Sequence, residues 1–142
     1  LLDRVIDRRL GIPITLAVLA IEVGRRSGVP VSGVSMPGHF LLRDTADASV
    51  FADPFDGGRR LTAEQCRRIH RVQSNGAAWT DSYLEPVSKR AIVARVLSNL
   101  KATAQQQGDL STLHWVMLLR QSIPGLAEHE RSEFQRLVAS LN

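Results

Sequence analysis

His39 and Asp53, near the middle of the chain, are the residues whose types and spacing best suit catalysis. They belong to "HFLLR" and "FADPFDGG", short segments with the alternating apolar pattern of strands. If the two segments form a hairpin with Leu41 opposite Phe51, His39 lies opposite Asp53 on one face. The carboxylate would then accept an imidazole N–H and fix one tautomer, as the base-orienting half of a catalytic triad does. A slip of one residue would separate the pair, which leaves a structural histidine and a turn aspartate as the alternative.

A nucleophile for this pair is harder to find. Thr15 lies early in an apolar segment that begins at Pro13, and its hydroxyl could approach His39, although a first-turn threonine more often satisfies backbone groups. Cys66 is the single cysteine. It falls in mid-helix on an apolar stripe with Ala63 and Ile69, which is typical of a buried core thiol. We therefore reject Cys66 as the nucleophile and keep Thr15 as a weak candidate.

Neither a metal nor a cofactor is predicted. Asp53 and Asp56 are too few carboxylates for a calcium cage, and Asp56-Gly57 is better explained as a turn. The other histidines lack metal-ligand spacing: His70, His114 and His129. Three nearby arginines could contact phosphate, but a solvated helix face is their commoner role: Arg67, Arg68 and Arg71.

The elements that would position these residues change in character along the chain. Residues 1–9 have apolar residues at helical spacing, and a second helix is predicted from Pro13 to about Arg26, with Gly28 just past its end. That helix is apolar nearly all round, as buried central helices are. Residues 29–60 then predict a small antiparallel sheet with short, turn-bounded strands.

Helices return after the sheet. "TAEQ" matches a capping box that opens a helix from Thr62 to about Val72, and residues 73–87 are loop-like. Three further helices are predicted over residues 88–107, 109–122 and 126–141, with Asp109 as a cap. The order predicts an α+β protein with a core over residues 1–87 and a C-terminal helical extension over residues 88–142, packed together as one compact unit.

Several motifs together resemble the SirB-type branch of the transglutaminase-like superfamily. They are "GIPITLA", "GVPVSGVSMPGHFLLR", "DPFDGG" and "PVSKRAIVARVLSNLK", and they span residues 1 to about 107. The resemblance implies a papain-like core in which one helix packs on an antiparallel sheet. It also implies a Cys-His-Asp triad, with His39 at the histidine position and Asp53 at the aspartate position. The cysteine position falls on Pro13, at the helix N-terminus, where a thiol would have a lowered pKa but proline offers no nucleophile.

Composition narrows the class of protein. The chain has 142 residues and a net charge of +4, with scattered arginines that argue only weakly for nucleic acid. No membrane span is expected, because the longest apolar run, from Ile12 to Ile21, is about half of what a bilayer needs. One cysteine and no signal peptide favour the cytoplasm, and the start at Leu1 suggests an excised piece of a longer chain.

The sequence thus favours a non-catalytic, cytoplasmic binding or regulatory module with a protein or peptide partner. One alternative is a hydrolase or acyltransferase in which His39 is the base and Asp53 its orienter. Its nucleophile would be Thr15 or a residue outside this segment. A second alternative, less favoured, is a basic nucleic-acid-binding module.

Overall fold

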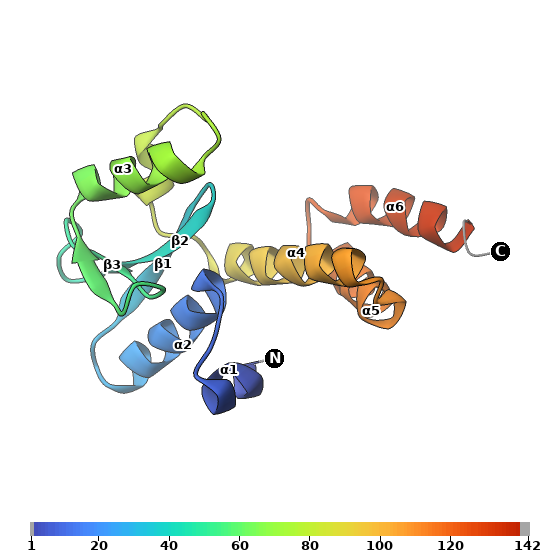
Figure 1. Ribbon diagram of the computed structural model, residues 1–142, viewed down its shortest axis with the longest axis horizontal. Helices are drawn as coiled ribbons and strands as arrows, with labels where there is room; N and C mark the ends of the chain where they lie inside the picture. Colours follow the sequence, from blue (N-terminus) through green and yellow to red (C-terminus); the bar gives the residue numbers. More distant parts are fainter. Residues whose placement is uncertain (1, 140–142) are drawn as a thin grey trace. The chain divides into compact units, whose positions relative to one another are not determined.

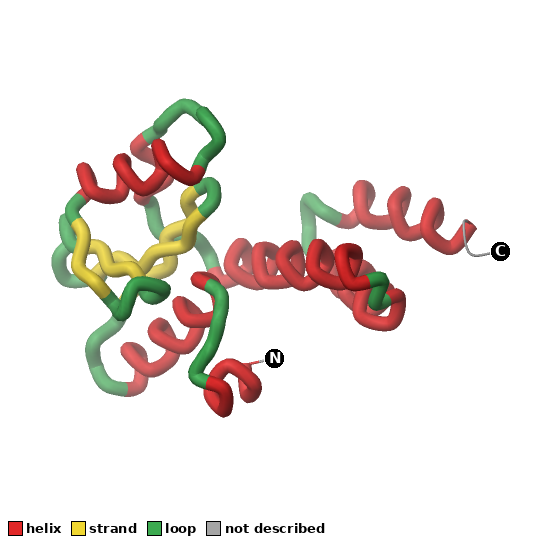
Figure 2. The backbone as a smooth tube through the Cα atoms, viewed as in Figure 1, coloured by secondary structure: helices red, strands yellow, loops and turns green. Residues whose placement is uncertain are grey.

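A computed structural model describes residues 2–139 (Figures 1 and 2). The chain divides into two compact units, residues 1–88 and residues 89–142. Helices flank a small antiparallel sheet in the first unit and make up the second, which confirms the predicted α+β class. Within residues 2–139, no helix has both the length and the apolar character needed to cross a bilayer.

The sheet of the first unit has four antiparallel strands in the order of the sequence. They are β1 (Val31–Met36), β2 (His39–Asp44), β3 (Phe51–Asp53) and β4 (Arg59–Leu61). β1 and β2 form a tight hairpin in which Met36 lies opposite His39, so Pro37 and Gly38 make the turn. Gly38 has φ +75°, and a Cβ there would lie 2.7 Å from the carbonyl oxygen of Gln73. Glycine is therefore required both by the turn and by the chain that crosses it.

Two helices cover opposite faces of this sheet (Figure 1). α2 (Pro13–Arg26) packs on β1 and β2, and α3 (Ala63–Gln73) packs on β2 and β4. The short α1 (Leu2–Arg8) contacts α2, and the 3-10 helix η1 (Asp81–Leu84) contacts β1.

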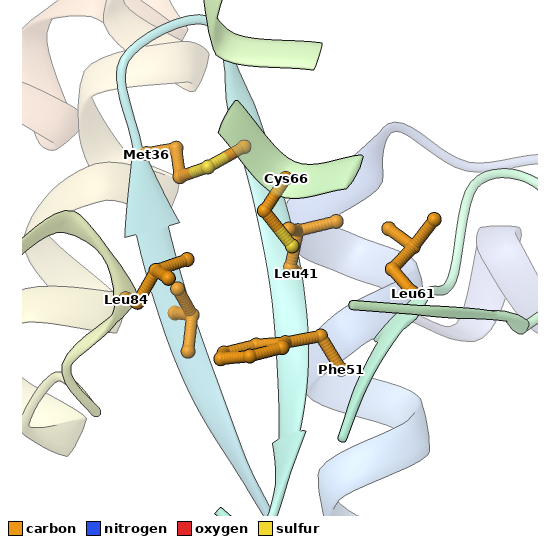
Figure 3. Packing of buried hydrophobic residues seen from close by; sticks show 7 residues of the cluster. Met36, Leu41, Phe51, Leu61, Cys66 and Leu84 are labelled. Carbon is orange, nitrogen blue, oxygen red and sulfur yellow. The ribbon is translucent and has the colours of Figure 1, made fainter. Parts of the chain in front are cut away.

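The α3 face of the sheet carries the main apolar cluster of the first unit (Figure 3). Its buried members are Val34, Met36, Leu41, Phe51, Leu61, Cys66 and Leu84. Each large side chain in such a cluster contributes about 1.5–3 kcal/mol through removal from water. Cys66 is fully buried among them, as expected for a core thiol.

Three predicted helix starts are confirmed, whereas the predicted end of the last helix, at residue 141, lies outside the described residues. Pro13 is the first residue of α2, where its missing N–H leaves no hydrogen bond unmade. Thr62 and Gln65 form the capping box of α3: the Gln65 N–H donates to Thr62 Oγ1 (3.3 Å) and the Thr62 N–H donates to Gln65 Oε1 (2.8 Å). Asp109 accepts the Thr112 N–H at 2.9 Å at the start of α5.

The second unit contains α4 (Lys89–Gln107), α5 (Leu110–Gln121) and α6 (Ala127–Ala139), and α5 packs on both of the others. Its small apolar cluster comprises Ala104, Leu113 and Met117, with Phe134 packed against it. Beside this cluster lies a buried carboxylate, Glu130, which is bound by two cations.

Candidate functional site

The β2–β3 register decides where His39 and Asp53 lie. Arg43 lies opposite Phe51 and Leu42 opposite Ala52, so the ladder is displaced by two residues from the one in which Leu41 faces Phe51. Because strand side chains alternate with a period of two, an even displacement leaves every side chain on its face. His39 and Asp53 therefore lie on one face as diagonal neighbours instead of opposite partners, on the side of Leu41 and Phe51.

The structure joins these two side chains. The His39 Nε2–H donates to Asp53 Oδ2 at 2.8 Å. Both residues are buried, with exposed fractions of 6% for His39 and 5% for Asp53. A carboxylate at Nε2 holds the imidazole in one orientation, so any proton transfer by His39 would have to use Nδ1.

Asp53 is itself held by the turn that follows β3. Its Oδ1 accepts the Phe55 N–H at 2.9 Å, and its carbonyl oxygen accepts the N–H groups of Asp56 (3.2 Å) and Gly58 (2.8 Å). Sequence reasoning missed Phe55 as a positioning residue. The Asp-Pro-Phe order could have revealed it, because an aspartate often accepts the N–H two residues ahead in such turns.

The start of α2 is where the resemblance places a nucleophile, but Pro13 and Thr15 do not offer an activated one there. Pro13 occupies the first helical position and has no group that could attack a substrate. In the part of the chain that the structure describes, both hydrogen bonds of the Thr15 hydroxyl are with Ile12: it donates to the Ile12 carbonyl (2.9 Å) and accepts the Ile12 N–H (3.1 Å). Thr15 is 4% exposed and caps its own helix.

Cys66 lies on the same side of the sheet as the His39–Asp53 pair, yet its environment suppresses thiol chemistry. Burial, with a smaller contribution from the negative charge of Asp53, raises its pKa to about 11. The thiolate is the reactive species, so Cys66 is essentially un-ionised at neutral pH. No group of three or more potential metal ligands occurs among residues 2–139.

The arrangement therefore supplies one half of a triad. His39 is oriented by Asp53, and Asp53 is oriented by the turn, which together suit a base or a rigid structural pair. The pair is enclosed, and none of the three nucleophile positions considered, Pro13, Thr15 and Cys66, presents an activated group to it.

Comparisons with known proteins agree with this fold. The family model described as "Transglutaminase-like superfamily" matches residues 1–98. A UPF0162 protein of Xylella fastidiosa is 48% identical over 104 residues, covering 70% of this chain and 37% of that protein. A UPF0162 protein of Pseudomonas aeruginosa is 36% identical over 133 residues, covering 92% of this chain and 48% of that protein.

A more distant relative is F-box only protein 21 of Mus musculus. It is 29% identical over 116 residues, which cover 75% of this chain and 18% of that protein. No solved structure matches the chain. The chain thus spans less than half the length of these UPF0162 relatives.

Proposed function

The chain belongs to the transglutaminase-like superfamily, and from that premise we propose that it is a non-catalytic binding or regulatory module of the SirB-type branch. The observation that carries this proposal is Pro13 at the first position of α2. In active members a cysteine thiol would occupy this helix start, where backbone N–H groups and the helix dipole stabilise a thiolate. Proline keeps the helix start and removes the nucleophile.

Two further observations support a lost activity. The Thr15 hydroxyl is fully engaged by Ile12, and the Cys66 thiol is buried with a raised pKa. The His39–Asp53 pair then acts as a buried hydrogen bond that ties β2 to β3. Its retention needs no catalytic role, because leaving either partner alone in the interior would be costly.

The proposed partner is a protein or peptide segment, met in the cytoplasm. Exposed apolar side chains precede α2: Ile6 is 60% exposed, Leu10 74% and Ile12 46%. Apolar side chains exposed in this way suit contact with another polypeptide.

An activity assay with three proteins tests the proposal. The wild-type chain, His39→Ala and Asp56→Asn are incubated with activated esters and with peptide amides, and acyl-enzyme is sought by mass spectrometry. Asp56 is an exposed turn residue and serves as the control. We expect the same background rate from all three and no acyl adduct. Turnover that His39→Ala abolishes, while circular dichroism shows that variant folded, would refute the non-catalytic assignment.

A gain-of-function variant tests whether Pro13 occupies a nucleophile position. Pro13→Cys places a thiol at the helix start, whereas Leu10→Cys places one on an exposed residue that lies before the N-cap of α2 and serves as the control. We expect the new thiol of Pro13→Cys to have a pKa of about 7, against about 8.5 for that of Leu10→Cys. The pH dependence of iodoacetamide alkylation measures both. Equal values would remove the basis for calling this site a former active site.

A second candidate function, a hydrolase or acyltransferase, is favoured by the 2.8 Å His39–Asp53 bond, which is what a base and its orienter show. Its nucleophile would come from outside this segment. The same assay on a full-length UPF0162 relative distinguishes the two functions, because only the enzyme predicts turnover there that depends on the matching histidine.

A further inference from the structure

A pocket in the first unit has no role in the proposals above. Its volume is about 460 Å³, within the range of small-molecule sites. It is formed by α3 and the segment that follows, and neither His39 nor Asp53 lines it. The lining residues are Glu64, Arg67, His70, Arg71, Ser74, Gly76, Ala77 and Trp79.

Two residues of this lining each have a buried polar atom without a partner in the described part of the chain. Among residues 2–139, His70 Nε2 and Ser74 Oγ make no hydrogen bond, and His70 is only 2% exposed. The Ser74 N–H donates to the His70 carbonyl oxygen (2.8 Å), which places the two residues one turn apart on the same side of α3. A buried polar atom without a hydrogen bond is unfavourable, so such atoms beside a pocket mark a place where a ligand can complete the hydrogen bonding.

Packing fixes the His70 ring in place. Its centroid lies 5.2 Å from the Trp79 ring, edge to face, and 5.2 Å from the Tyr83 ring. Trp79 is itself anchored, since its Nε1–H donates to Asp81 Oδ1 at 2.8 Å. The packed imidazole therefore cannot easily turn to find another partner.

The two pocket arginines differ in their engagement. The Arg67 guanidinium donates to Asp81 Oδ1 at 2.9 Å and lies 5.6 Å from the Trp79 ring centroid, so it is already neutralised and stacked. Arg71 has no acidic partner among residues 2–139. It is thus the pocket cation that is available to a ligand.

We propose that this pocket binds a small molecule through an oxyanion, either a carboxylate or a phosphate. Arg71 would supply the positive charge, Ser74 and His70 would donate the buried hydrogen bonds, and Trp79 would offer a flat apolar surface to the rest of the ligand. A cationic ligand is disfavoured by Arg71. An extended polyanion is disfavoured by Glu64 and by the small, concave shape. This inference does not depend on whether His39 and Asp53 catalyse a reaction.

A nuclear magnetic resonance titration of the whole chain tests the site. ¹⁵N-labelled protein in a buffer without oxyanions, such as bis-Tris chloride, receives inorganic phosphate, acetate or sodium chloride at constant ionic strength. The chain has two tryptophans. The Trp79 indole N–H reports the pocket, and that of Trp115, in α5, is the internal control.

We expect saturable shifts of Trp79 and of the amides of Ser74, Gly76 and Ala77 with phosphate, acetate or both, with Kd in the millimolar range, on the order of −4 kcal/mol. Trp115 and the chloride arm should not respond. A response to phosphate alone identifies a phosphate ligand and a response to acetate alone a carboxylate. Absence of a saturable shift with either, up to about 20 mM, overturns the proposal.

Three variants distinguish specific binding in the pocket from nonspecific attraction of anions to a positively charged protein. Arg71→Ala should weaken binding about tenfold, because one charge-assisted hydrogen bond is lost. Ser74→Ala should weaken it a few-fold while leaving the melting temperature of the free protein unchanged or higher, since an unsatisfied hydroxyl disappears. Arg60→Ala is the control: Arg60 is an exposed arginine of β4 that does not line the pocket. Equal weakening by Arg60→Ala and Arg71→Ala would contradict a specific site.

Discussion

The two units of the chain bury polar groups in different ways. In the first unit, the His39–Asp53 pair lies on the sheet face that carries the apolar cluster, and its two side chains are joined by a hydrogen bond of 2.8 Å. In the second, the fully buried Glu130 accepts hydrogen bonds from Lys101 Nζ (2.9 Å) and Arg120 Nε (2.7 Å).

The surroundings of the second arrangement explain how three charges are tolerated in a core. Lys101 also reaches Glu133 (2.6 Å), and Arg120 also donates to Ser98 Oγ (2.6 Å). Burial alone would raise the pKa of Glu130, but the hydrogen bonds from Lys101 and Arg120 hold it below its ordinary value. Buried polar groups are therefore tolerated in both units where partners surround them, and the cost of removing one partner should rise with the charge left behind.

The largest effect is expected from Glu130→Gln. Neutralising this carboxylate leaves Lys101 and Arg120 buried with less compensation, which should lower the free energy of unfolding of the second unit by about 3 kcal/mol. This loss of unfolding free energy is at the lower end of the range for breaking a buried ion pair, because both cations keep another partner. Urea unfolding followed by the Trp115 indole resonance measures it.

The control for that variant is Glu128→Gln, on the same helix at an exposed position. It should change the stability by less than about 0.5 kcal/mol. Equal losses of unfolding free energy from the two variants would mean that the buried ion cluster stabilises the second unit no more than an exposed carboxylate does.

A smaller loss is expected from Asp53→Asn in the first unit. The carboxylate accepts from both His39 and Phe55, whereas an amide has one acceptor oxygen, so one of the two bonds must weaken or His39 must change tautomer. The free energy of unfolding should fall by about 2 kcal/mol, the value for a hydrogen bond to a charged group. The Trp79 resonance during urea unfolding measures it, and Asp56→Asn is the exposed control. A loss as large as that from Glu130→Gln would contradict the expectation that the cost of removing a partner rises with the charge left buried.

The smallest effect should come from the exposed ion pairs of Glu22, whose carboxylate is bound by Arg25 (2.7 Å) and Arg26 (2.6 Å). Hydrogen bonds from Arg25 and then Arg26 lower its pKa from 4.5 to about 2. Because the folded-state value is the lower one, the stabilisation is present above pH 4.5 and is lost as the pH falls toward 2.

The melting temperature of Glu22→Gln, relative to wild type, measures this contribution. The small deficit should shrink between pH 5 and pH 2 and should also shrink in high salt, because the pairs are exposed. A deficit that persists at pH 2 would show that Glu22 acts through packing and not through its charge.

Much of the fold could be predicted because its signals are local. The cap residues Pro13, Thr62 and Asp109 act within four residues of the helix starts, and each does what its type predicts. The sequence pattern does not predict strand β4 or the 3-10 helix η1. Each has at most four residues, too few for a periodic pattern.

The candidate site could also be predicted from a local signal in the sequence. Alternation placed His39 and Asp53 on one face even though the register assumed for them was displaced by two residues. The pocket was not found in this way. Arg71 is a possible phosphate contact from the sequence and His70 has no predicted role, and nothing in their spacing indicates that Trp79 packs on the histidine beside a cavity.

By itself, the sequence determined the helix ends, the two-residue alternation of the strands and the absence of a nucleophile at Pro13, because each depends on one residue type or a few neighbours. Only the tertiary structure decided which polar groups are buried together. Lys101 and Glu130 are 29 residues apart, and the alternation that places His39 and Asp53 on one face does not show that both are buried. The free energy of such contacts depends on the exclusion of water by the surrounding side chains, which no local pattern encodes.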